Sequence, residues 1–89
     1  MRSHTTSRFR EAFRALPGPD QRQAQAAYRL FANNPRHPSL RFKLIHSTRP
    51  IYSARISAEY RALGVRDGEE MIWFWIGTHA NYEQLISRL

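Results

Sequence analysis

The sequence contains no cysteine, and its 89 residues include only four glycines. Without cysteine, the chain has no disulfide framework, no thiolate metal site and no cysteine nucleophile. No apolar run approaches the roughly 18 to 20 residues that a membrane span needs, and the first residues lack the apolar segment of a secretory signal. These absences favour a cytoplasmic protein without a membrane partner.

Local motifs that bind metals or nucleotides are also missing. The sequence has no HExxH pair, no EF-hand loop and no glycine-rich phosphate loop. His4, His37 and His46 stand alone in expected loops or near a terminus, without ligand spacing to a carboxylate. We therefore expect neither a metal nor another cofactor, and we interpret these three histidines as surface residues.

Lysine is almost absent, although the formal net charge is +7 and Lys43 is the single lysine among 14 basic residues. Residues 1–66 carry 13 basic and 3 acidic side chains, whereas residues 67–89 carry 1 basic and 4 acidic side chains. Such a positive field favours a polyanionic partner, either nucleic acid or an acidic protein. The same composition would arise if arginine were simply used on solvent-exposed faces. Charge alone therefore does not identify a partner.

Length and composition predict a single domain over residues 1–89, and its first half has helical spacing. Apolar residues recur with that spacing over residues 7–16, and the run Pro17–Pro19 ends this helix. A second apolar stripe follows and stops at Asn33–Pro35. Two helices joined by so short a link are expected to form an antiparallel hairpin.

After Pro38 the pattern becomes that of strands, with Asp67 and Gly68 as a hairpin turn. The continuous apolar run at residues 71–76 predicts a central buried strand, and the tail at 80–89 predicts a short helix. The other expected strands cover residues 40–44, 51–56 and 60–65. The predicted fold class is α+β: an N-terminal helix hairpin packed on a four-stranded, mainly antiparallel twisted sheet, with a short C-terminal helix.

One predicted hairpin sets two arginines side by side. If residues 57–59 form its loop, Arg55 stands opposite Arg61 on one sheet face. Like charges in that position are mildly destabilising unless an anion lies between them. A bulge would instead shift the register by one residue and separate the two arginines. The opposite face is expected to form the core under the helix hairpin, with Tyr52, Ala54, Ile56, Tyr60, Ala62 and Gly64.

His79 follows the predicted central strand, and Tyr82 comes three residues later. Functional groups are often placed in the segment after a strand, where a rigid scaffold positions them. Both residues can also have purely structural roles. The histidine would then lie beside a helix cap, and the tyrosine would pack the last helix onto the sheet. Trp73 and Trp75 are expected in the core, or one of them serves as an exposed anchor for a partner.

The second half of the chain resembles the RelE/ParE toxin superfamily of bacterial type II toxin–antitoxin systems, through the run YSARISAEYRALGVRDGEEMIWFWIGTHANYEQL at residues 52–85. Two earlier segments, TTSRFREAFRALP and AYRLFANNPRHPSLRFK, extend the resemblance to about residues 5–88. It implies the fold predicted above and a small acidic antitoxin as partner, which the positive charge fits. It also implies one of two activities: RelE-type members cleave mRNA in the ribosomal A site without a metal, whereas ParE-type members inhibit DNA gyrase and are not nucleases.

The resemblance also implies catalytic roles for four residues. Arg61 matches the position of a phosphate-binding arginine in nuclease members, and Arg55 lies near a position that is commonly basic. His79 and Tyr82 fall where members carry acid, base or base-stacking groups. Attack of a ribose 2′-hydroxyl on the adjacent phosphate needs positive groups for the phosphate, a base for the hydroxyl and an acid for the leaving oxygen.

The chain departs from the RelE pattern on the strand before the phosphate-binding arginine. Members of that type often place two lysines there, whereas this chain has Ser53 and Arg55. An arginine cannot act as a general base because its pKa exceeds about 12. Proton transfer would fall to His79, Tyr82 or Glu59. We expect a ribosome-dependent mRNA endonuclease neutralised by an antitoxin; the alternatives are a gyrase inhibitor and a weakly toxic or inactive protein that acts in an autorepressing toxin–antitoxin complex.

Overall fold

The computed structural model describes residues 1–89 as three α-helices, one short 3₁₀ helix and five strands. In chain order these are β1 (Arg2–Thr5), α1 (Ser7–Arg14), α2 (Gly18–Asn33), η1 (Pro38–Leu40), β2 (Lys43–Leu44), β3 (Ile51–Arg55), β4 (Tyr60–Asp67), β5 (Glu70–Thr78) and α3 (His79–Ile86). The strands form one sheet in the order β1-β5-β4-β3-β2, in which β1 runs parallel to β5 and the other pairs are antiparallel. The predicted α+β class is confirmed.

The sheet separates two apolar cores. On one face, α1 and α2 contribute side chains that pack against the sheet in a core of ten buried residues: Phe9, Ala24, Ala27, Phe31, Leu40, Ala54, Ala62, Met71, Trp73 and Ile76. On the other face, Tyr82 of α3 packs against Ile51 and Leu63. The small residues Ala54 and Ala62 lie under the two helices, as predicted. None of the helices is both long and apolar enough to cross a membrane.

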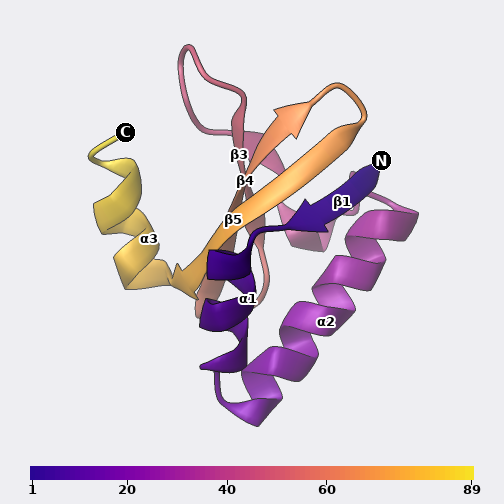
Figure 1. The fold of residues 1–89 in the computed structure, drawn as a ribbon, viewed down its shortest axis with the longest axis vertical. Helices are drawn as coiled ribbons and strands as arrows, with labels where there is room; N and C mark the ends of the chain where they lie inside the picture. The colour runs from indigo at the N-terminus through magenta and orange to yellow at the C-terminus, as the bar shows by residue number, and fades with distance from the viewer.

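The helix boundaries follow from capping side chains and prolines. The side chain of Thr6 accepts a hydrogen bond from the Phe9 amide at 3.1 Å and so begins α1. The predicted helix at 7–16 is two residues too long. The amides of residues 15 and 16 donate to carbonyls three residues earlier, so these residues form only a turn before Pro17. Figure 1 shows that α1 and α2 meet near this proline and then diverge, so the predicted hairpin is open.

The parallel strand β1 corrects the predicted four-stranded sheet to five strands. Residues Arg2–Thr5 carry no apolar side chain, so hydrophobic alternation cannot reveal a strand there. The strand forms because its backbone pairs with β5: the Arg2 amide donates to the Glu69 carbonyl at 2.8 Å, and the Thr6 amide to the Trp73 carbonyl at 3.0 Å. This pairing joins segments nearly 70 residues apart.

The outer edge of β1 is capped by side chains of the two helices. The Tyr28 hydroxyl donates to the Ser3 carbonyl at 3.1 Å, and the Arg10 guanidinium donates to the Thr5 carbonyl at 2.6 Å. Carbonyls on an open edge are the acceptors that an added strand would use. A strand added at the β1 edge would therefore have to compete with these two side-chain hydrogen bonds.

The predicted strand at 40–44 is reduced to the two residues of β2. Leu40 instead ends η1 and is buried, and the next residue, Arg41, has a positive φ of 44° that interrupts the extended backbone. Phe42 still reaches the helix-side core, where its ring stacks on Tyr52 with 4.8 Å between centroids. The alternation therefore predicted the inward-pointing Leu40 and Phe42 correctly, but Leu44 is exposed and the ladder begins only at Lys43.

A bulge in the β4–β5 ladder sends the two tryptophans to opposite faces. The register pairs Leu63 with Trp75 but Gly64 with Trp73, so one additional residue of β5 lies between them. Trp73 is buried against α1 and α2, whereas Trp75 is half-buried on the face that carries α3. Trp73 thus lies in the core as predicted.

Close packing at the bulge generates a stability prediction. A β-carbon on Gly64 would lie 2.7 Å from Met71 Cε and 2.8 Å from Trp73 Cε3. Overpacking of this kind typically costs about 1–3 kcal/mol. We expect Gly64→Ala to lower the free energy of unfolding by about that amount in urea denaturation. The control Gly18→Ala meets only an ordinary 3.5 Å contact, and equal losses in the two variants would contradict the prediction.

Candidate functional site

Two arginines stand directly opposite each other on β3 and β4. The ladder pairs Arg55 with Arg61, which confirms the register predicted for this hairpin and excludes the one-residue shift. The turn is closed by the Ile56 amide, which donates to the Tyr60 carbonyl at 3.1 Å. Both arginines lie on the sheet face that carries α3, which we call the arginine face.

Neither arginine is neutralised by an acidic side chain, since no carboxylate oxygen lies within 4.0 Å of their guanidinium nitrogens. Arg61 Nη1 donates to the main-chain carbonyls of Ser57 at 2.6 Å and Tyr60 at 3.0 Å. Arg55 Nε is buried and has no hydrogen-bond partner. A buried donor without an acceptor costs free energy, so an acceptor supplied by a bound anion would stabilise this arrangement.

Arg61 is affected both by burial and by the charges of neighbouring side chains. Burial lowers the pKa of Arg61 from its ordinary value by disfavouring the charged form, and the positive charge of Arg55 lowers it further. The charge of Arg41 acts in the same direction, while Tyr82 and Glu83 oppose the shift. A guanidinium nevertheless stays protonated at neutral pH. The arginine face is therefore a concentrated and partly desolvated positive site.

Tyr82 reaches the arginine face from the first half of α3. Its side chain is buried against Ile51 and Leu63, so it packs α3 onto the sheet, which is one of the two roles considered for it from the sequence. Its hydroxyl is also close enough to Arg61 to affect the pKa of that guanidinium. The same residue therefore fixes the helix and presents a phenol beside the arginines.

His79 lies at the start of α3, next to Tyr82, with 5.9 Å between the two ring centroids. Its amide donates to the Glu59 carbonyl at 2.7 Å, which ties the beginning of α3 to the β3–β4 turn. Its imidazole Nε2 lies 3.3 Å from Glu83 Oε1, four residues further along the helix. Both side chains are about half exposed, so this pair is a weak constraint on stability.

Glu83 is a site residue that the sequence reasoning missed. Its charge acts on Arg61, and it is the carboxylate that contacts His79. The available signal was the spacing of four residues between His79 and Glu83, which places two helical side chains side by side. Ser53, by contrast, is buried and presents no reactive group, while the side chain of Glu59 is exposed in the turn.

The remaining histidines take part in local hydrogen bonds away from the arginines. His4 Nε2 contacts Glu70 Oε1 at 2.6 Å and links β1 to β5. His37 Nδ1 accepts from the Ser39 amide at 3.2 Å and caps η1. His46 Nδ1 accepts from the amides of the loop that follows it. No group of three or more histidine, aspartate or glutamate side chains is arranged to hold a metal ion.

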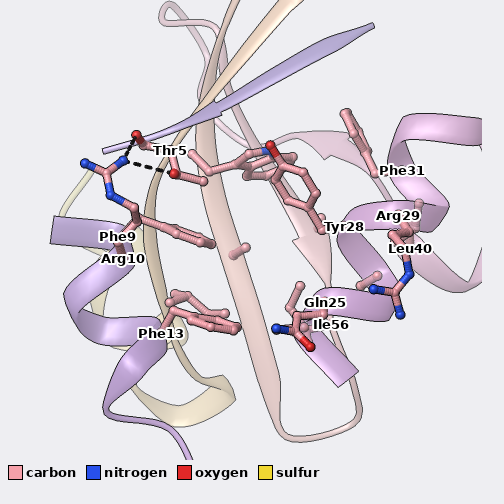
Figure 2. A pocket seen from close by; sticks show the side chains of 16 residues that line it. Thr5, Phe9, Arg10, Phe13, Gln25, Tyr28, Arg29, Phe31, Leu40 and Ile56 are labelled. Carbon is pink, nitrogen blue, oxygen red and sulfur yellow. Dashed lines mark hydrogen bonds between the residues drawn. The ribbon is translucent and has the colours of Figure 1, made fainter. Parts of the chain in front are cut away.

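A second feature is an apolar groove of about 410 Å³ between α1, α2 and the sheet. Figure 2 shows Phe9 and Phe13 of α1 pointing across it toward the α2 side, where Tyr28 lies. Twelve of its sixteen lining residues are apolar. Arg10 and Arg29 are the charged residues of the lining, one from each helix. The groove is therefore apolar inside and positively charged at its margins.

A family model described as the ParE-like toxin domain matches residues 21–84. The chain belongs to the ParE-like toxin domain family. The matched range includes Arg55, Arg61, His79 and Tyr82, together with most of α2 and strands β2 to β5. The predicted membership of the RelE/ParE superfamily is confirmed.

Solved toxin structures share the fold of this ParE-like domain. YafQ from Escherichia coli BL21(DE3) matches with a TM-score of 0.73 and 14% identity, covering 92% of this chain and 98% of YafQ. A RelB–RelE antitoxin–toxin complex from Methanococcus jannaschii gives 0.73 and 14% over 92% and 96% of the two chains. Isolated E. coli RelE gives 0.66 and 17% over 99% and 98%. No curated protein sequence shows a significant match.

The unpaired arginines predict that the domain is stabilised by a compact polyanion. We expect inorganic pyrophosphate at about tenfold its dissociation constant to stabilise the fold by roughly 1.4 kcal/mol and to raise the melting temperature by roughly 5–10 °C. Arg55→Gln should lose most of this shift, whereas Arg49→Gln, in the exposed loop before β3, should keep it. Scanning calorimetry or fluorimetry measures both, and equal shifts in all three proteins would contradict the prediction.

Proposed function

We propose that this protein is the toxin of a toxin–antitoxin pair and that it cleaves RNA at the arginine face. The observation that supports this is the convergence of Arg55 and Arg61 without an acidic partner, together with the unsatisfied Arg55 Nε. A phosphate between the two guanidinium groups would supply the missing acceptor and offset their repulsion. The family and the fold are consistent with this role.

In the proposed reaction, a ribose 2′-hydroxyl attacks the adjacent phosphate and the 5′-oxygen leaves. Arg61 and Arg55 bind the phosphate and stabilise the negative charge that develops in the transition state. They supply the charge that a metal ion supplies in other phosphoryl-transfer sites, so the proposed reaction is metal-independent. The proposed substrate is mRNA bound in the ribosomal A site, as the resemblance to RelE-type members implies.

Proton transfer in this scheme falls to side chains of α3, because a guanidinium does not release its proton. His79 is the first candidate, since histidine is the natural acid or base near neutral pH and this ring is about half exposed. Glu83 contacts the His79 ring and orients it. Tyr82, whose ring is buried against Ile51 and Leu63, is suited to orienting the phosphate rather than to stacking on a base.

Inhibition of DNA gyrase without catalysis is the second candidate function. The observation that favours it is Ser53, which stands where RelE-type nucleases often carry lysine and which is buried against the sheet. A site that lacks this cation binds phosphate but transfers protons less well. The two candidates differ in their dependence on His79, because a gyrase inhibitor does not need a proton carrier.

The nuclease proposal predicts cleavage of mRNA on purified programmed ribosomes, mapped by primer extension. We expect Arg61→Ala to reduce the cleavage rate at least about 10²-fold, because it removes a transition-state contact. His79→Ala should reduce it by about 10²–10⁴-fold, the usual contribution of a positioned acid or base. Arg49→Ala serves as the surface control. Absence of cleavage by the folded wild-type protein would contradict the nuclease proposal. Inhibition of gyrase supercoiling would then be assayed.

The antitoxin is proposed to dock in the apolar groove on the opposite face. An acidic partner segment with apolar side chains matches a groove that is apolar inside and has Arg10 and Arg29 in its lining. The net charge of +7 steers such a partner toward the toxin. Because the β1 edge is capped, the partner reaches the groove by side-chain insertion rather than by adding a strand to β1.

Charge reversal on α2 tests this docking. We expect Arg29→Glu to weaken binding of the cognate antitoxin about tenfold, with a reduced salt dependence, because a favourable charge pair at the rim becomes repulsive. Arg22→Glu makes the same charge change on the same helix outside the groove lining and should have a smaller effect. Isothermal titration calorimetry at two salt concentrations measures both. Equal weakening by the two variants would contradict docking in the groove.

A further inference from the structure

The side chain of Trp75 lies on the arginine face, one strand away from Arg61. The β4–β5 ladder pairs Arg61 with Gly77 and Leu63 with Trp75. Directly paired residues share a face of the sheet, and Leu63 and Trp75 both belong to the smaller core beneath α3. Trp75 and Gly77 are therefore on the face that Arg61 occupies, in the strand next to it.

Gly77 leaves the space that the indole of Trp75 occupies beside Arg61. A β-carbon on Gly77 would lie 2.6 Å from Trp75 Cζ2 and 2.8 Å from Trp75 Cη2. The six-membered ring of the indole thus fills the position that a side chain of residue 77 would take, directly opposite Arg61. Since neighbouring strands are about 4.8 Å apart, Arg55, Arg61 and this ring follow one another across β3, β4 and β5.

Part of this indole has no partner within the chain. Trp75 is half-buried, and no other aromatic ring is paired with it. Its Nε1 is not buried and has no acceptor, whereas Nε1 of Trp73 lies 3.4 Å from Ser3 Oγ. No guanidinium covers the ring either, since the one cation–π contact of the domain joins Arg66 and Tyr52. The accessible part of the ring is therefore available to another planar group.

We propose that Trp75 is a stacking platform for a nucleobase next to the phosphate that Arg55 and Arg61 bind. This inference rests on the proposed RNA-cleaving function and adds a base-binding residue to it, in a role that buried Tyr82 cannot fill. A pair of cations beside an aromatic ring matches the two parts of a nucleotide, its phosphate and its planar base. Packing against the smaller core already holds the ring, so stacking immobilises little further side-chain freedom. Because stacking uses the face of a base and not its hydrogen-bonding edge, the platform accepts any of the four bases.

Two uncleavable strands test the platform separately from catalysis. One is a short single-stranded RNA with methylated 2′-hydroxyls, and the other is an abasic strand with the same number of phosphates; binding is followed by fluorescence anisotropy. Stacking of one base on an aromatic side chain contributes about 5- to 150-fold in affinity. We expect the wild type to prefer the RNA by about that factor, Trp75→Leu to lose most of the preference and Trp75→Phe to keep part of it. Phe74→Leu removes a ring of the same core at the bulge, farther from Arg61, and should keep the preference.

Pyrophosphate, which has phosphates but no base, shows whether the variant keeps the rest of the site. Trp75→Leu should retain the pyrophosphate-dependent rise in melting temperature. Equal affinity of the wild type for the two strands would overturn the inference without any variant, and so would an undiminished preference in Trp75→Leu. Weakened binding of the acidic antitoxin with unchanged RNA binding would assign Trp75 to that partner and also overturn it. A wild type that prefers the RNA but cleaves nothing on the ribosome would contradict the nuclease proposal alone.

Discussion

The register of the β3–β4 hairpin is the constraint on which the site depends. Ala54 and Ala62 face the helices across one side of this hairpin, and Arg55 and Arg61 must then share the other side. A slip of one residue would exchange the two faces and drive the arginines into the apolar core. Burial on one face therefore forces like charges together on the other, where an anion offsets the repulsion.

The second element of the site is α3, which the sheet positions through Tyr82 and Thr78. Tyr82 packs into the smaller core, and the Thr78 side chain caps the helix by accepting from the Asn81 amide at 3.2 Å. The beginning of α3 thus lies beside the start of β4 and the end of β5, and its residue Glu83 contacts His79 and acts on Arg61. The same packing that stabilises the helix also determines the placement of its polar groups.

Positive charge is distributed differently on the arginine face and in the apolar groove. The arginine face concentrates cations that contact no acidic side chain, whereas the groove between α1 and α2 is apolar and has arginines only in its margin. The sheet lies between most residues of the two surfaces, but Ala27, Leu40 and Ile56 line both the groove of Figure 2 and a smaller pocket that Arg55 also lines. The two surfaces therefore approach each other beside Arg55, at the end of β3.

Local patterns in the sequence determined the helices, the β3–β4 register and the neighbouring arginines, because periodicity, prolines and short loops act over a few residues. The tertiary structure decided the rest through contacts between distant segments. β1 depends on backbone pairing without an apolar signal, and the bulge beside Gly64 depends on how β5 packs against both cores. The effect of the Glu83 charge on Arg61 likewise arises only when α3 packs beside β4, since the two residues are remote in sequence.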